Sequence, residues 1–248
     1  MEFTKKEIKN IIIASIILGI VFFLNEWRLT DHNLETGILS LIGLIILSAI
    51  IYLVHATSQK LMAQSVDAEI EFSLVQAKKI QTVIKEMPLP KYLFPIGPII
   101  TLLITVLSGG KFLFIALASF HHNISRYRRV GHKWTNIKEF EEAKIAFAGP
   151  LSNLILLAIF KILLPLSPQF LSKAVFISST LAIFHLLPLP QFDGLKIVMG
   201  SRVLYIFAIV LAILTIFLIN ITSVFIALFL ALIVAIAVSF YFLYRSNK

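Results

Sequence analysis

The chain is poor in charge and contains no cysteine. Only 14% of its 248 residues are charged and 58% are hydrophobic, whereas an ordinary soluble domain has about 25% charged and roughly 45–50% apolar residues. A soluble protein of this composition could not cover its surface with polar groups. The absence of cysteine excludes disulfides and thiolate metal ligands, and leaves imidazole and carboxylate as the metal-binding groups to look for.

Long runs without charge are the most prominent feature that is present. Residues 36–59, 174–192 and 203–244 contain no charged side chain, and about 20 apolar residues suffice to cross a bilayer. We therefore predict an all-α polytopic membrane protein that forms a single transmembrane domain over residues 1–248. The six predicted spans are 8–25, 37–60, 145–164, 174–188, 203–219 and 223–243.

The net charge of +9 would suggest a nucleic-acid partner in a soluble protein. Here the basic residues lie in short segments between apolar runs, which favours a membrane topology and no nucleic-acid binding. The two basic stretches, 60–91 and 121–144, are both expected on the cytoplasmic side. The same rule places both termini in the cytoplasm of a multi-pass protein of the cell membrane, with the lipid bilayer as its first partner.

The apolar residues 92–120 lie between the two basic stretches, so they must enter and leave the membrane by the same face. Gly109-Gly110 divides this region, and Pro95, Gly97 and Pro98 are expected to break its first half. We predict a re-entrant or β-hairpin element, which is tolerated only where protein shields its backbone. One ordinary span followed by a surface segment is the alternative.

Three motifs stand in an order and spacing that carry a family resemblance. The first is YLVHATSQKLMAQ at 52–64, the second is AFAGPLSN at 146–153, and the third is FHLLPLPQFDG at 184–194. Over nearly the whole chain the sequence resembles the site-2 proteases, a family of intramembrane zinc metalloproteases. It looks most like the archaeal and bacterial members that lack a PDZ domain. In that family the motifs read HExxH, AGPxxN and NLLPxPxxDG.

The resemblance implies a zinc site in which His55 and Asp193 are metal ligands. Gly149, Pro150 and Asn153 would be substrate-contacting or structural residues. The predicted topology brings His55, Asn153 and Asp193 to one cytoplasmic depth. In the family, the second histidine of HExxH completes the ligand set and its glutamate acts as general base.

Two positions depart from that pattern in ways that remove the chemistry. Ala56 stands at the general-base position, so no catalytic residue can be assigned there. Gln59 stands at the second histidine position, and an amide is a poor zinc ligand. A third departure is His185, where the family usually has asparagine. If 188–193 folds back at the membrane face, His185 can join His55 and Asp193 in a relocated, non-catalytic metal site.

Other roles for these residues remain open. His55 can be a hydrogen-bonded polar residue inside a helix bundle, and Asp193 can cap the helix that follows it. Asn153 can bond a neighbouring helix.

We therefore expect a proteolytically inactive homologue, a pseudoprotease that can bind a transmembrane helix of a client protein. The alternative is a zinc-dependent intramembrane metalloprotease with an atypical site, in which another carboxylate would have to replace the missing base; Glu69 and Glu71 follow the second span too far along the chain for that role. A transporter is a third class, with little intramembrane charge to support it.

Overall fold

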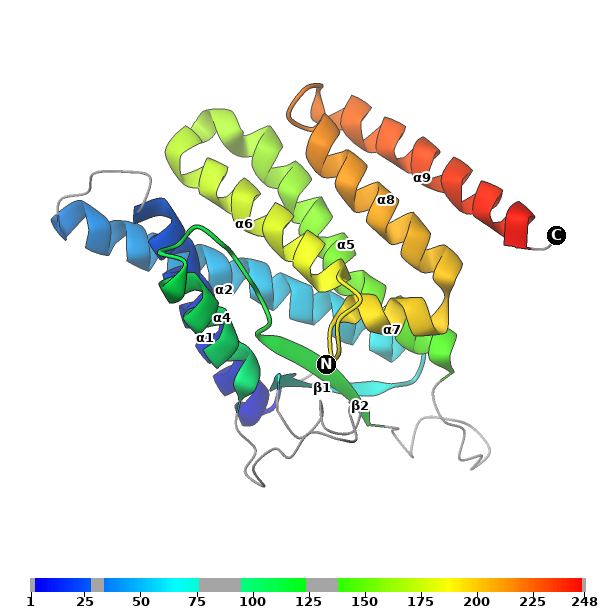
Figure 1. The fold of residues 1–248 in the computed structure, drawn as a ribbon, viewed down its shortest axis with the longest axis horizontal. Coiled ribbons are helices and arrows are strands. Elements are labelled where there is room, and N and C mark those ends of the chain that lie inside the picture. The colour runs from blue at the N-terminus through cyan, green and yellow to red at the C-terminus, as the bar shows by residue number, and fades with distance from the viewer. Residues whose placement is uncertain (1–2, 28–33, 76–94, 124–137, 247–248) are drawn as a thin grey trace. The chain divides into compact units, whose positions relative to one another are not determined.

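The computed structural model describes residues 3–27, 34–75, 95–123 and 138–246 (Figure 1). The chain divides into two compact units. Unit 1 comprises Met1–Ala56 and Glu69–Asn123, and unit 2 comprises Thr57–Ala68 and Ile124–Lys248. Helix α2, Leu34–Ser65, contributes to both units as one continuous helix.

In unit 1, α1 (Lys5–Trp27) begins with a reciprocal cap. The Thr4 hydroxyl accepts from the Glu7 amide, and the Glu7 carboxylate accepts from the Thr4 amide at 2.7 Å. This capping box satisfies two N–H groups that the helix itself cannot bond. Glu7 is also buried, and its other oxygen accepts from the Phe72 amide at 3.1 Å. The Asn10 side chain donates to the Phe72 carbonyl, so α1 holds both main-chain groups of that residue.

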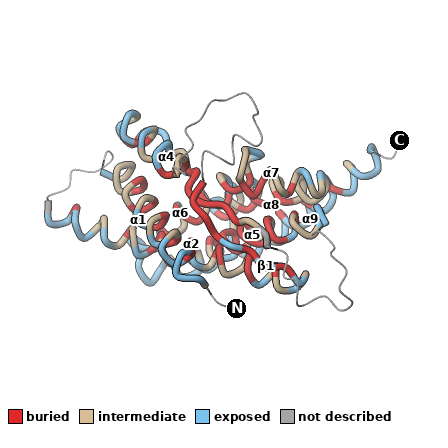
Figure 2. Tube along the Cα trace, turned by 90° about the horizontal axis from the view of Figure 1, so that it is seen from below, coloured by how far each residue is buried: buried red, intermediate tan, exposed pale blue. Residues whose placement is uncertain are grey.

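Phe72 lies in a two-stranded antiparallel sheet of β1 (Glu69–Leu74) and β2 (Ala118–Asn123), where it faces Phe120. A hairpin of strands was predicted within 92–120. Strand β2 covers the end of that region, but β1 lies in the preceding stretch, for which the sequence predicts only a polar, basic segment. The EIEFSL sequence of β1 alternates between exposed and buried residues before becoming fully buried, and much of the sheet is red in Figure 2.

Helix α4 (Ile96–Leu107) occupies the segment in which Pro95, Gly97 and Pro98 were expected to break a helix. That expectation was wrong, because Pro95 is the N-cap and the other two lie in the first turn, where a missing N–H costs nothing. A side chain on Gly97 would meet the Ala116 carbonyl at 2.0 Å, so the close packing there requires glycine. The predicted division at 109–110 is confirmed, since Gly109 and Gly110 both have positive φ after α4 ends.

Unit 2 is a helical bundle that follows the predicted runs. Its helices are separated by short connections at 164–167 and 219–223. Small residues at four-residue spacing form the buried face of the last helix, which packs against the helix before it. Its elements are α5 (Glu139–Leu163), the short 3-10 helix η1 (Leu164–Leu166), α6 (Pro168–Leu186), α7 (Asp193–Gly200), α8 (Arg202–Leu218) and α9 (Val224–Ser246).

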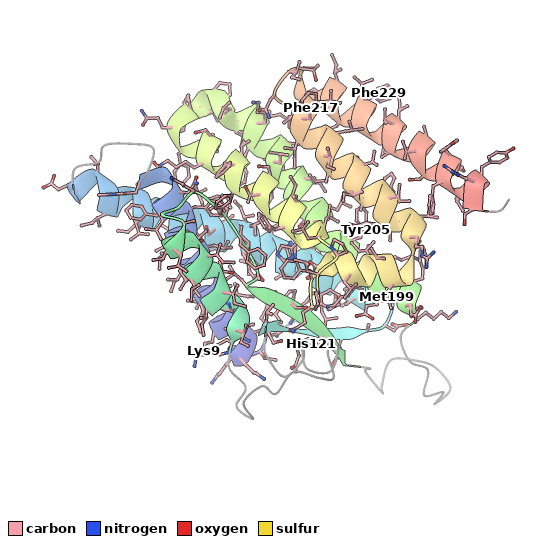
Figure 3. The ribbon with its side chains drawn as sticks, in the orientation of Figure 1. Lys9, His121, Met199, Tyr205, Phe217 and Phe229 are labelled. Atoms are coloured by element: carbon pink, nitrogen blue, oxygen red, sulfur yellow. The ribbon has the colours of Figure 1, made fainter. Side chains whose placement is uncertain are left out.

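Five helices are long and apolar enough to cross a membrane: Lys5–Trp27, Glu35–Ser65, Glu139–Leu166, Pro168–Leu186 and Val224–Ser246. The remaining predicted span, 203–219, corresponds to α8, which has 17 residues and falls among the shorter apolar helices. Large apolar side chains on the outside of the bundle, such as Phe217 and Phe229, are 62% and 64% exposed (Figure 3). The fold is thus compatible with a membrane protein, while the six-span count and the single-domain assignment stay predictions.

The topology was predicted largely from basic residues that lie outside the described ranges. These are Lys78, Lys79, Lys85 and Lys91 of the first stretch, and Arg126, Arg128, Arg129 and Lys133 of the second.

Candidate functional site

A buried histidine–aspartate pair joins the end of α6 to the start of α7. The Nδ1 atom of His185 lies 2.7 Å from Oδ2 of Asp193, and both residues are buried, with 9% and 2% of their surface exposed. Asp193 is the first residue of α7, and Phe192 is the N-cap. Asp193 is thus not at the N-cap position that the alternative interpretation gave it, and its carboxylate bonds a histidine across the turn.

The turn between the two helices places the pair. Helix α6 ends at Leu186, two residues before Pro188, because a proline disfavours helical conformation in the residue before it. Hydrogen bonds from Leu189 to Leu187 and from Phe192 to Leu189 then fold the chain back. The segment 188–193 was predicted to fold back in this way. Gln191 takes a positive φ of 69° within the turn.

Gly194 makes the tight return possible. A Cβ atom at this position would lie 2.2 Å from the Leu186 carbonyl oxygen and 2.5 Å from that of Leu187. Both obstacles are main-chain atoms, which cannot move aside as a flexible side chain can. The Asp193-Gly194 dipeptide thus combines a functional group with the residue that lets its helix begin so close to α6.

His55 lies in the C-terminal half of α2, with 1% of its surface exposed. Its ring stacks on Tyr52, with centroids 5.9 Å apart and planes inclined by 12°. One turn later the same helix is bonded to α5: the Ser58 hydroxyl donates to the Ala148 carbonyl at 3.0 Å. Because α2 is continuous, this anchor also positions His55.

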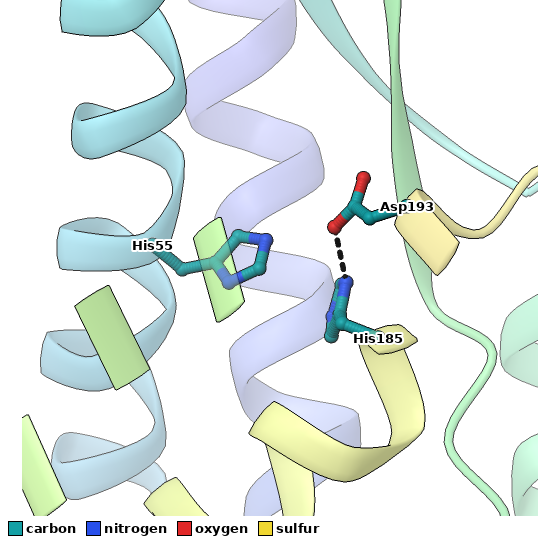
Figure 4. A group of neighbouring side chains, drawn as sticks. All are labelled: His55, His185 and Asp193. Carbon is teal, nitrogen blue, oxygen red and sulfur yellow. Dashed lines mark hydrogen bonds and ion pairs between the residues drawn. The ribbon is translucent and has the colours of Figure 1, made fainter. Parts of the chain in front are cut away.

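His55, His185 and Asp193 form a buried group that could bind a metal ion (Figure 4). Each residue offers one ligand atom, and these atoms lie within 4.8 Å of one another. The donors are two imidazoles and one carboxylate, which is a common ligand set of zinc sites with an open fourth position. The group that could bind a metal consists of the same three residues as the relocated site predicted from the sequence, His185 included.

The ligand atoms, which lie 2.7 Å to at most 4.8 Å apart, would have to shift by about 0.5–1.5 Å to hold such an ion. Two ligands of a tetrahedral zinc ion, each about 2.0–2.1 Å from the metal, lie roughly 3.3 Å apart. The 2.7 Å separation of His185 and Asp193 is a hydrogen bond. A metal bound through Nδ1 would require the pair to open by about half an ångström. Binding through the other ring nitrogen would keep Asp193 as the hydrogen-bonded partner that orients the imidazole.

Gln59 has a structural role that sequence reasoning missed. Its Nε2 group donates to the Ala146 carbonyl at 3.5 Å, a long hydrogen bond. Pro150 was expected near a helix start but lies in the interior of α5, which begins at Glu139. Because proline has no N–H, it leaves the carbonyl four residues earlier, that of Ala146, without its helical donor. Gln59 supplies a donor to that carbonyl.

The remaining predicted residues all lie on described helices or strands. Ala56 follows His55 in α2 and is fully buried. Gly149, Pro150 and Asn153 are all buried in α5. Glu69 and Glu71, the candidate replacements for the general base, lie on β1 with exposed side chains.

Comparisons of the chain with protein-family profiles, with curated proteins and with solved structures found no match.

Proposed function

We propose that this chain is a membrane-embedded pseudoprotease of the site-2 type, which holds a metal ion and binds transmembrane segments without cleaving them. The observation that carries the proposal is the buried group of His55, His185 and Asp193. The helix of His55, α2, carries Ala56 and Gln59 where the resembling family has its glutamate and second histidine. The three motifs support a relationship to that family. The positions of the basic segments support a multi-pass protein of the cell membrane with both termini in the cytoplasm.

Zinc is the metal that the donor set favours. His55, His185 and Asp193 would hold it, with Asp193 acting as a ligand or as the partner that orients His185. Zinc can lower the pKa of a bound water to near 7 and polarise a carbonyl. Whether a zinc-bound water could hydrolyse a peptide bond then depends on the side chains around the metal.

Hydrolysis needs a group that takes the proton from the attacking water, and a methyl group at Ala56 cannot do so. Losing a general base typically costs about 10²–10⁴-fold in rate. Gln59 is engaged with the Ala146 carbonyl. The exposed side chains of Glu69 and Glu71 do not belong to the buried group. These features favour binding over cleavage.

An extended client segment could add to the sheet by main-chain hydrogen bonds. At Phe72 the outward main-chain groups of β1 are taken by Glu7 and Asn10 of α1. A client that paired with β1 at this point would have to displace both side chains, so we place the contact with clients away from Phe72.

The zinc-dependent metalloprotease is the second candidate, and one comparison separates the two. The purified wild type and Asp193→Ala are incubated with a panel of transmembrane substrates, with and without a zinc chelator, and both cleavage and photo-crosslinking are measured. We expect crosslinking without cleavage. Cleavage that disappears on chelation and in Asp193→Ala would overturn the pseudoprotease and establish the enzyme.

Restoring the family residues gives a complementary test. In Ala56→Glu with Gln59→His the base and the second imidazole return to α2. We expect this double variant to cleave substrates that the wild type only binds. The variant Ala56→Gln with Gln59→His, which lacks the carboxylate, is the matched control and should stay inactive.

A further inference from the structure

The first turns of α1 carry three lysines at the helix end where cations are disfavoured. Lys5, Lys6 and Lys9 follow the cap residue Thr4, and the N-terminal end of a helix has a partial positive charge that favours anions. The nearby acid, Glu7, is buried and bonded to the amides of Thr4 and Phe72. The lysines therefore do not stabilise the helix end, and their charge is available for another partner.

Lys5 and Lys9 share a groove on unit 1 with aliphatic side chains. Residues four apart lie on the same side of a helix, and these two lysines line an open hollow of about 360 Å³ together with Ile8, Ile12 and Ile13. Both lysines are exposed, and within the described ranges neither makes a hydrogen bond or an ion pair. Figure 3 shows Lys9 at the N-terminal end of α1.

The apolar side of the groove continues along the helix. Ile8, Ile12 and Ile16 are 47%, 53% and 40% exposed and follow one another at four-residue spacing. At 1.5 Å per residue, the distance from Lys5 to Ile16 is roughly 16 Å. One leaflet of a bilayer has a hydrocarbon depth of about 15 Å. The surface thus has two cations at one end and an aliphatic stripe, Ile8 to Ile16, that is about 12 Å long and covers most of the depth of one leaflet.

We propose that this surface of α1 is a binding site for an anionic glycerophospholipid, with its phosphate between Lys5 and Lys9 and one acyl chain along Ile8, Ile12 and Ile16. The charge of the lysines and the length of the apolar stripe carry the inference. It does not depend on the proposed function, because it uses no residue of the metal group.

Binding is measured on the purified full chain in uncharged detergent, with fluorescent phosphatidylglycerol as the probe. Each lysine near an anionic lipid is expected to contribute about fivefold to affinity. Lys5→Gln and Lys9→Gln should each weaken binding about fivefold, and the double variant about 25-fold. Lys6→Gln removes the same charge from the same turn without lining the groove, and should change affinity less than twofold.

Three further measurements distinguish a specific lipid site from a non-specific lipid surface and from a simple phosphate site. Ile12→Trp, which fills the groove and keeps both lysines, should weaken phosphatidylglycerol binding. Phosphatidylcholine should bind at least tenfold more weakly. Equal binding of phosphatidylcholine, or an equal loss in Lys6→Gln, would overturn the proposal in favour of a non-specific lipid surface. Competition by glycerol phosphate as strong as by the lipid would overturn it in favour of a simple phosphate site. Circular dichroism of each variant separates loss of binding from loss of folding.

Discussion

The Nδ1 atom of His185 and the Oδ2 atom of Asp193 lie 2.7 Å apart, although eight residues of the chain separate them. The contact closes the turn between α6 and α7 inside the protein, where water cannot solvate the carboxylate. A buried carboxylate without a partner is strongly unfavourable. The pair is thus important for the stability of the fold, whether or not a metal is bound.

Breaking this pair should destabilise the protein more than removing it. His185→Ala leaves Asp193 buried without its bonded imidazole, and we expect a loss of about 3–5 kcal/mol in the free energy of unfolding. In His185→Leu with Asp193→Asn the buried charge is gone, so the loss should be smaller than the sum of the single changes. Unfolding in mixed micelles measures both. Additive losses would contradict the coupling, and Glu69→Ala, on an exposed residue, is the control that should change stability by less than about 0.5 kcal/mol.

Zinc should stabilise the wild type. A ligand that binds only the folded state adds about 4 kcal/mol when its concentration is a thousand times its Kd. Thermal unfolding with and without zinc measures the effect, and His55→Ala and His185→Ala should abolish it. Magnesium, which prefers oxygen ligands in octahedral geometry, should have no effect. A wild type that purifies without metal and gains no stability from zinc would rule out the metal group.

The bond between Gln59 and Ala146 should matter only while Pro150 is present. Gln59→Leu is expected to cost about 1 kcal/mol, the usual net value of one hydrogen bond. In a Pro150→Ala background the residue at 150 can donate to Ala146 itself, so the same change should cost much less. Equal costs in the two backgrounds would show that Gln59 stabilises the fold by packing alone.

Gly194→Ala should disrupt the return of the chain after α6. The added Cβ would meet two main-chain oxygens, those of Leu186 and Leu187, and overpacking of this kind costs typically about 1–3 kcal/mol. Gly37→Ala is the matched control, because its Cβ would meet the side chain of Trp27, which can rotate away. We expect Gly194→Ala to lower stability and zinc binding together, and Gly37→Ala to leave zinc binding intact. Full zinc binding by Gly194→Ala would show that the turn tolerates a side chain.

The small residues of α9 should be needed for its packing on α8. Ala227, Ala231, Ala235 and Ser239 form the buried side of α9, and small side chains let helix backbones approach closely. Ala231→Phe should destabilise the protein by about 1–3 kcal/mol. Ile233→Phe, at a position that is 46% exposed, should be close to neutral. Equal effects of the two changes would argue against the alanine face as the packing surface.

The sequence predicted well whatever depends on local patterns. The apolar runs became helices, and Gly109-Gly110 ended a segment. His185 stands out because it departs from the family motif, which usually has asparagine there, and because it precedes Asp193 by eight residues. The turn that joins the pair could therefore be foreseen.

What could not be foreseen depends on contacts between distant segments. Strand β1 needs β2, which lies more than forty residues further along the chain, and nothing in the local EIEFSL pattern names that partner. The predicted span 145–164 covers only the apolar part of α5, which begins six residues earlier, at Glu139. Pro150 lies inside α5, and Gln59 of α2 donates to the carbonyl that the proline leaves without a helical donor. No spacing rule in the sequence could indicate this contact between two helices.

The two bonds from α1 to Phe72 also bear on how copies of this protein avoid one another. A two-stranded sheet has an open side on each strand, and such sides can pair with the same side of a second molecule and start aggregation. On β1 the carboxylate of Glu7 and the amide of Asn10 already occupy the outward groups of Phe72. A neighbouring strand would have to displace both side chains before it could pair in the middle of this edge. The cap of the first helix thus protects the sheet against self-association.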